Sequence, residues 1–139
     1  MDSAPDSARE VWLLMSDLVL DNMRRRQVAE ALGMSFGRSR ALRRLARRPM
    51  SMRELADALG IDPPNATVVV QDLEAQGLVR RRPHPTDGRA KVVEATRKGK
   101  ELARRADEIL ADPPAMLSAL GAEDLEALRR ILARAREPG

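Results

Sequence analysis

The side chains best placed to do chemistry lie between residues 62 and 91, and their chemistry would be the binding of nucleic acid. Asn65 and Gln71 are residue types that can hold an adenine edge through two hydrogen bonds. Thr67 can bond a base or a phosphate, and Val68 can pack on a thymine methyl group. We expect this segment to contact DNA through Pro64, Asn65, Thr67, Val68 and Gln71.

A basic stretch follows this segment and surrounds a loop with the sequence PHPTDGR. Arg89 lies at the tip, where an arginine can enter a minor groove and respond to its width and negative potential. Asp87 can brace Arg89 through a salt bridge, and Lys91 follows the turn. The expected DNA contacts of the loop are Asp87, Arg89 and Lys91, and the expected phosphate contacts are Arg53, Arg80 and Arg81.

Capping signals predict the elements that carry these residues. Ser51-x-x-Glu54 forms a capping box that opens a helix ending at Gly60. Asp62 caps the next helix, which has Pro63 in its first turn and ends at Gly77. Its apolar stripe is Ala66, Val69, Val70 and Leu73, and two strands, 78–82 and 90–95, enclose the loop. A helix pair followed by such a hairpin predicts a winged helix-turn-helix, mainly α with a small β-hairpin wing.

The flanking segments predict further helices. The first runs over residues 7–32 to Gly33 and is apolar on most sides, so a partner subunit is the economical way to cover it. Ser35 caps a helix to Arg47, Thr96 caps one to Ala111, and the last covers 122–136. We therefore expect dimerisation helices in residues 1–34 and 100–139 around a DNA-binding domain in residues 35–99.

Charge is concentrated in the middle of the chain. Residues 35–99 contain 14 Lys or Arg against 7 Asp or Glu, whereas the two flanks are slightly acidic and the whole chain has a net charge of +4. Such a patch is the footprint of a phosphate-binding surface, although a solvated arginine-rich face explains charge alone equally well. The chain has no cysteine, no apolar run that could span a bilayer and no basic leader. We expect a cytoplasmic protein that does not enter membranes.

Enzyme and metal chemistry find little support. His84 is the only histidine, and it lies between two prolines on the loop. There is no cluster of His, Asp and Glu at ligand spacing and no glycine-rich phosphate loop. We expect no catalytic residue, metal or cofactor.

Several short motifs together resemble the multiple-antibiotic-resistance regulator (MarR) family of dimeric bacterial winged-helix transcription factors. The residues that carry the likeness are Glu54-Leu55-Ala56, Leu59-Gly60-Ile61, Leu73-Glu74, Gly77-Leu78-Val79, Arg82-Pro83, Asp87-x-Arg89 and Thr96-x-x-Gly99. The likeness is strongest over residues 51–99. It implies that the helix after Asp62 is the recognition helix, that Arg89 is the wing arginine, and that the first and last two helices form a homodimer interface.

The resemblance also points to a small-molecule effector, because many members of the family sense small aromatic or lipophilic anions. Trp12, Met15, Met34 and Phe36 are the candidate lining residues, although such residues at helical spacing are more often plain core. The leading hypothesis is a homodimeric transcriptional regulator, a repressor rather than an activator, that binds a pseudo-palindromic operator in double-stranded DNA. The alternatives are a sequence-indifferent architectural DNA binder and a winged helix used for protein interaction.

Overall fold

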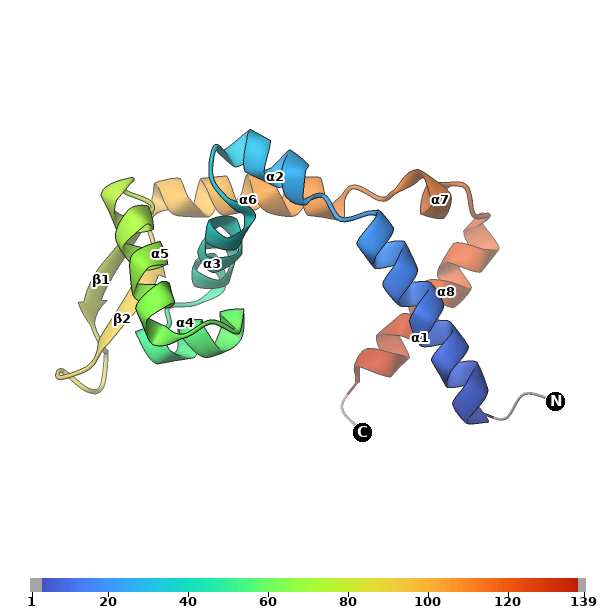
Figure 1. The fold of residues 1–139 in the computed structure, drawn as a ribbon, viewed down its shortest axis with the longest axis horizontal. Helices are drawn as coiled ribbons and strands as arrows, with labels where there is room; N and C mark the ends of the chain where they lie inside the picture. The colour runs from blue at the N-terminus through green and yellow to red at the C-terminus, as the bar shows by residue number, and fades with distance from the viewer. Residues whose placement is uncertain (1–3, 138–139) are drawn as a thin grey trace. The chain divides into compact units, whose positions relative to one another are not determined.

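The computed structural model describes residues 4–137 of the chain, which form eight helices and two strands (Figure 1). The helices are α1 (Ala4–Asp21), α2 (Arg25–Leu32), α3 (Phe36–Arg47), α4 (Met52–Leu59), α5 (Pro63–Ala75), α6 (Arg97–Ala111), α7 (Ala115–Ser118) and α8 (Ala122–Arg136), and the strands are β1 (Val79–Pro83) and β2 (Lys91–Ala95). The predicted fold class, mainly α with a two-stranded wing, is confirmed.

Contacts divide the chain into two compact units. Residues 24–111 form the first, which we call the winged-helix unit. The segments before residue 24 and after residue 111 form the second, which we call the terminal unit. Both α2 and α6 therefore pack with the winged helix, although the sequence pattern grouped them with the flanking dimerisation segments.

The predicted caps are present at four helix starts, and at α6 the Thr96 hydroxyl accepts from the Gly99 amide at 3.2 Å. The Ser35 hydroxyl accepts a hydrogen bond from the Arg38 amide at 3.3 Å. Ser51 and Glu54 form both bonds of the capping box, at 3.1 and 3.2 Å. The Asp62 carboxylate accepts from the Asn65 amide at 2.8 Å. Because each cap satisfies an otherwise unpaired N–H group, these residues fix where each helix begins.

One predicted helix is wrong, because residues 7–32 form two helices with a turn between them. The chain leaves α1 at Asn22, whose side-chain amide donates to the Leu18 carbonyl oxygen at 2.8 Å. On α2, Val28 is fully buried and Leu32 nearly so, and both belong to the core of the winged-helix unit. The continuous apolar pattern concealed the break, since Asn22 satisfies a helix-end carbonyl without a glycine or proline to mark it.

The winged-helix unit has one core, to which α2 to α6 and both strands contribute. Helix α6 packs against α2 and α3, while α5 packs against α4 and β1. The strands are antiparallel, with Val79 opposite Ala95 and Pro83 opposite Lys91. Met50 adds a bridge to Val93 on the other side of β2, with backbone bonds of 3.0 and 2.7 Å. The largest fully buried side chains are Leu42, Leu45, Leu55, Leu73, Leu78, Val28 and Val70.

The terminal unit consists of α1, α7 and α8, and it buries little of its apolar surface. No side chain described in residues 6–21 is buried. The apolar residues of α1 that are 43–67% exposed are Val11, Trp12, Leu13, Leu14, Leu18, Val19 and Leu20. On α8, Ile131 is 47% and Leu132 38% exposed. Patches of this kind commonly mark an interaction surface.

Two kinds of feature are absent from residues 4–137. None of the helices there is both long and apolar enough to cross a membrane. No group of three or more His, Cys, Asp or Glu residues in that range could hold a metal ion.

Candidate nucleic-acid interface

Helix α5 has a buried face and an exposed face, divided as its sequence periodicity predicts. Ala66, Val70 and Leu73 are completely buried, and Val69 is partly buried against the same core. The opposite face presents Pro64, Asn65, Val68 and Gln71 to solvent, with Thr67 half-buried beside them. Val68 is 51% exposed, which is unusual for a valine in a helix that packs on a core. This exposed face carries the residues predicted to contact DNA.

Polar contacts order the first turn of α5. One oxygen of the Asp62 carboxylate accepts from the Asn65 backbone amide at 2.8 Å, and the other accepts from the Asn65 side-chain amide at 3.1 Å. The Thr67 hydroxyl donates to the Pro63 carbonyl oxygen at 3.0 Å. The cap was predicted from the sequence, but the second Asp62 bond was missed. An Asp followed three residues later by an Asn at a helix start is the signal that pointed to it.

The loop between the strands is held by its own side chains. The His84 amide donates to the Ala90 carbonyl oxygen at 3.0 Å and closes the loop. Within it, His84 Nδ1 accepts from the backbone amides of Thr86 and Asp87, both at 3.2 Å. His84 is therefore a structural acceptor that shapes the loop, a role that was not predicted from the sequence.

Asp87 braces the loop tip in a different way from the one predicted. Its carboxylate accepts from the Arg89 backbone amide at 3.1 Å, and no salt bridge joins the two side chains in the described part of the chain. Because Asp87 lies only two residues before Arg89, its short side chain reaches the Arg89 backbone N–H group. Acidic side chains commonly make such bonds in turns. The backbone of Arg89 is thereby fixed while its guanidinium group extends into solvent, as does the side chain of Lys91.

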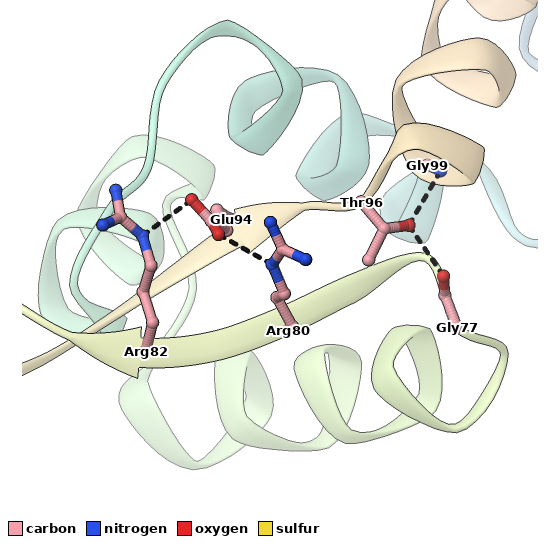
Figure 2. A network of polar contacts seen from close by, with 6 residues as sticks. All are labelled: Gly77, Arg80, Arg82, Glu94, Thr96 and Gly99. Carbon is pink, nitrogen blue, oxygen red and sulfur yellow. Dashed lines mark hydrogen bonds and ion pairs between the residues drawn. The ribbon is translucent and has the colours of Figure 1, made fainter.

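Three arginines of β1 are paired with carboxylates. Glu94 lies between Arg80 and Arg82 and accepts from each at 2.7 Å (Figure 2). Arg81 lies 3.8 Å from Glu74 on α5. The hydrogen bond from Arg80 is the largest cause that holds the pKa of Glu94 below its ordinary value, and the charge of Arg82 acts in the same direction. Phosphate groups would therefore have to compete with these carboxylates for Arg80 and Arg81.

Other arginines divide into paired and unpaired groups. Arg38 pairs with Asp72 and joins α3 to α5, while Arg48 pairs with Glu54 at 3.0 Å. Within residues 36–96, the arginines for which no ion pair forms are Arg40, Arg44, Arg47, Arg53 and Arg89. Arg53 and Arg89, both predicted as DNA contacts, are exposed members of this group.

A joint of close contacts connects the end of α5 to the start of α6. The Thr96 hydroxyl donates to the Gly77 carbonyl oxygen at 2.7 Å and accepts from the Gly99 amide at 3.2 Å (Figure 2). Gly99 is buried, and a Cβ atom placed on it would overlap the carbonyl oxygen of Leu78. Thr96-x-x-Gly99 is thus a packing device that holds α6 against the turn after α5.

The four residues predicted to line an effector pocket have different environments. Trp12 and Met15 are exposed on α1, in the terminal unit. Met34 is buried in the core of the winged-helix unit. Phe36 is partly buried, with the Arg25 guanidinium 5.3 Å from its ring centre. The two pairs belong to different units, and Met34 has the surroundings of an ordinary core residue.

Comparisons with known proteins agree with this geometry. Residues 32–90, which run from the end of α2 through the loop, match the model of the MarR family. The crystal structure of the transcriptional regulator BldR from Sulfolobus solfataricus matches with 28% sequence identity and a TM-score of 0.67, covering 96% of this chain and 99% of that one. Over its winged helix the chain thus resembles the MarR family.

Two further MarR-family structures share the fold at lower identity. Wild-type MarR from E. coli, in its apo form, matches with 17% identity and a TM-score of 0.70 over 99% of both chains. A mutant of MepR from S. aureus, bound to an oligodeoxyribonucleotide, matches with 20% identity and a TM-score of 0.61. That match covers 92% of this chain and 94% of the MepR chain. The likeness therefore extends to both units, beyond the segment that matches the family model.

Proposed function

We propose that this protein is a regulator of the MarR family, a homodimeric transcriptional repressor that binds a pseudo-palindromic operator in double-stranded DNA. The observation that carries the proposal is the hydrogen-bonded, exposed face at the start of α5, together with the exposed Arg89 on a loop of the same unit that internal hydrogen bonds hold. The DNA-bound structure of MepR, which shares the fold, supports it.

In this proposal α5 is the recognition helix and enters the major groove. Asn65 and Gln71 carry amide groups suited to base edges, Thr67 carries a hydroxyl, and Val68 is an exposed apolar contact for a thymine methyl. The start of α5 offers no free N–H group to phosphate, because Pro63 and Pro64 have none and the Asn65 amide is bonded to Asp62. Arg89 enters the adjacent minor groove, while Lys91 and Arg53 contact the backbone. The N-terminal end of α5 therefore reads sequence, and the loop fixes its register on the duplex.

The dimer in this proposal covers the apolar residues of α1. A helix with leucine, valine and tryptophan side chains exposed around it gains by burial against a second copy, at roughly 25 cal/mol per Å² of apolar surface. The terminal unit would supply this interface and the winged-helix unit would contact DNA, whereas the sequence pattern drew the bounds of the dimerisation segments at residues 34 and 100. The two-fold axis then places two recognition helices on half-sites about one helical turn apart, on the order of 34–36 Å.

Release by a small lipophilic or aromatic effector is the second part of the proposal. A ligand that prefers a dimer with a different helix spacing shifts the population away from the DNA-binding state. Trp12, Met15, Met34 and Phe36 are the candidate lining residues of its site. The burial of Met34 in the core makes it the weakest member of that set.

The proposed function is tested by replacing Arg89 with alanine. We expect this variant to bind operator DNA about 10- to 100-fold more weakly, because a minor-groove and phosphate contact is lost at both half-sites. Fluorescence anisotropy with a labelled duplex measures the change. Arg26→Ala is the matched control, since it removes the same charge from an exposed arginine that pairs with Glu30 on α2. Equal binding by the Arg89 variant and the control would contradict the assignment of the wing.

The pairing of Glu94 predicts the opposite effect for Glu94→Gln. Without the carboxylate, Arg80 and Arg82 become available to phosphates, so affinity at low salt should rise. The slope of log K against log salt should become more negative by about 1 to 2 for each subunit. A salt-series titration measures both. Glu108→Gln is the control, because it frees Arg104 on the exposed side of α6. An unchanged slope for Glu94→Gln would mean that neither arginine reaches the backbone.

The same variant has a predicted pH signature. The pKa of Glu94 is lowered in the folded protein, so its pairing stabilises the fold above the ordinary carboxyl pKa. This contribution is lost as pH falls through the lowered folded pKa. The melting temperature of Glu94→Gln should therefore be lower than that of the wild type at neutral pH. The two melting temperatures should converge in acid.

An architectural DNA binder is the competing function, and the exposed Val68 on α5 is the observation that favours it, because valine contributes no hydrogen bond to a base. Such a protein would keep the salt dependence of binding but would not distinguish an operator from random DNA.

A further inference from the structure

We propose that Asp62 sets the base preference of the recognition helix by fixing the orientation of the Asn65 side-chain amide. This inference rests on the proposed function and deepens it, because it assigns a class of base to one position of each half-site. The preferred class is a base that carries an exocyclic amino group in the major groove, namely adenine or cytosine.

The two oxygens of the Asp62 carboxylate hold different groups of Asn65. Oδ1 caps α5 by accepting from the Asn65 backbone amide at 2.8 Å, and Oδ2 accepts from Asn65 Nδ2 at 3.1 Å. An ionised carboxylate only accepts hydrogen bonds, whereas an asparagine amide has a donor end and an acceptor end. Asp62 therefore attracts the Nδ2 end of the amide and directs Oδ1 away from itself. The cap and the orientation come from one side chain.

The hydrogen of the neighbouring Thr67 hydroxyl is also used in a hydrogen bond within the helix. It donates to the Pro63 carbonyl oxygen at 3.0 Å, which leaves its lone pairs for an incoming partner. The polar groups at the start of α5 thus present mainly acceptors: Asn65 Oδ1, Thr67 Oγ1 and the unused lone pairs of the Asp62 carboxylate. Asn65 is exposed in the first turn of the helix, whereas Thr67 is half-buried.

An acceptor-rich surface selects bases by the groups they show in the major groove. Adenine offers its N6 amino group and cytosine its N4 amino group, whereas guanine O6 and thymine O4 are acceptors that would face Asn65 Oδ1 without a hydrogen. For adenine, the second Nδ2 hydrogen of Asn65 can also reach N7 and complete the two-bond pairing. We expect adenine or cytosine to be favoured over guanine or thymine about 5- to 100-fold at this position.

The decisive variant is Asp62→Asn, since Asn and Asp cap helices equally well. Its Oδ1 can keep the bond to the Asn65 amide, while an NH₂ group replaces the second oxygen and donates to Asn65 Oδ1. The Asn65 side chain then turns its donor end towards the groove, and the preference at that one position should invert to guanine or thymine. Asp62→Ser keeps a cap but holds neither end of the amide, so the preference there should relax towards onefold.

The measurement is selection from a library of randomised duplexes, followed by sequencing, for the wild type and the two variants. Asn65→Ala is run alone and combined with Asp62→Asn, because loss of a negative charge near DNA raises affinity for every duplex alike. In the Asn65→Ala background, Asp62→Asn should leave the base profile unchanged. Far-UV circular dichroism confirms that each variant keeps the wild-type helix content.

The outcomes separate this inference from the function on which it rests. A wild type that selects no sequence would contradict the proposed repressor and this inference together. A wild-type consensus that persists unchanged in Asp62→Asn would overturn the role of Asp62 alone, and so would a uniform gain in affinity without a change in base preference. Inversion at one position per half-site, absent without Asn65, is the result that the proposal predicts.

Discussion

Replacing Gly99 with alanine is expected to lower the free energy of unfolding by about 3 kcal/mol, or the melting temperature by roughly 10 °C. The new methyl group would overlap the Leu78 carbonyl oxygen and approach Leu42 Cδ1 to 3.1 Å. Neither neighbour can move freely. The Leu78 oxygen already accepts from the Thr96 amide at 2.9 Å, and Leu42 is fully buried. Relief therefore requires α6 to shift away from the turn after α5.

Thermal and urea unfolding at fixed protein concentration test this prediction, with Gly37→Ala as the matched control. Gly37 lies in α3 with nothing within 4 Å of an added Cβ. Alanine is the better helix former, so the control should be neutral or stabilised by up to about 1 kcal/mol. If Gly99→Ala unfolds at the same temperature as Gly37→Ala, the joint between α5 and α6 is not the close contact that we describe.

Replacing Leu14 with glutamate is expected to abolish the dimer and to weaken operator binding by about 10²- to 10⁴-fold. Leu14 is 64% exposed on α1, within the apolar surface that we assign to the partner subunit. A carboxylate buried there against leucine and valine would lose its hydration without gaining a partner. A monomer engages one half-site and loses the effective concentration that the second half-site provides, which accounts for the size of the loss.

Sedimentation velocity gives the oligomeric state of this variant, and anisotropy gives its affinity for a duplex with two half-sites. Gln27→Glu is the control, because it adds the same charge at an exposed polar position on α2. Since Leu14 makes no contribution to the core of the winged-helix unit, helix content should persist. A Leu14→Glu protein that still sediments as a dimer would show that α1 is not the interface.

Local capping chemistry made much of the fold predictable from sequence. The Ser51–Glu54 box and the Asp62–Pro63 start fixed the two central helices, because a cap needs only residues within one turn. The division of residues 7–32 into two helices was missed, since Asn22 ends α1 with a side-chain bond that periodicity does not reveal. Packing within the winged-helix unit then decides that Val28 is core.

The site was less predictable than the fold, because each arginine has several carboxylates with which it could form an ion pair. The register of the hairpin places Arg80 directly opposite Glu94, and this pair follows once the register is counted. The pairing of Arg38 with Asp72 joins residues 34 positions apart, and nothing local indicates it. Free and paired arginines look alike in a sequence, so a charge balance overstates the number available to phosphate.

A salt-series binding titration tests the central claim most directly, with DNA from upstream of this protein's own gene and a scrambled duplex of the same composition. Transcriptional regulators often act on their own genes, so this upstream DNA is the first operator to test. We predict a preference of about a thousandfold or more for the upstream DNA, at one dimer per duplex, with affinity falling steeply as salt rises. Absence of binding to either duplex at low salt would contradict this prediction.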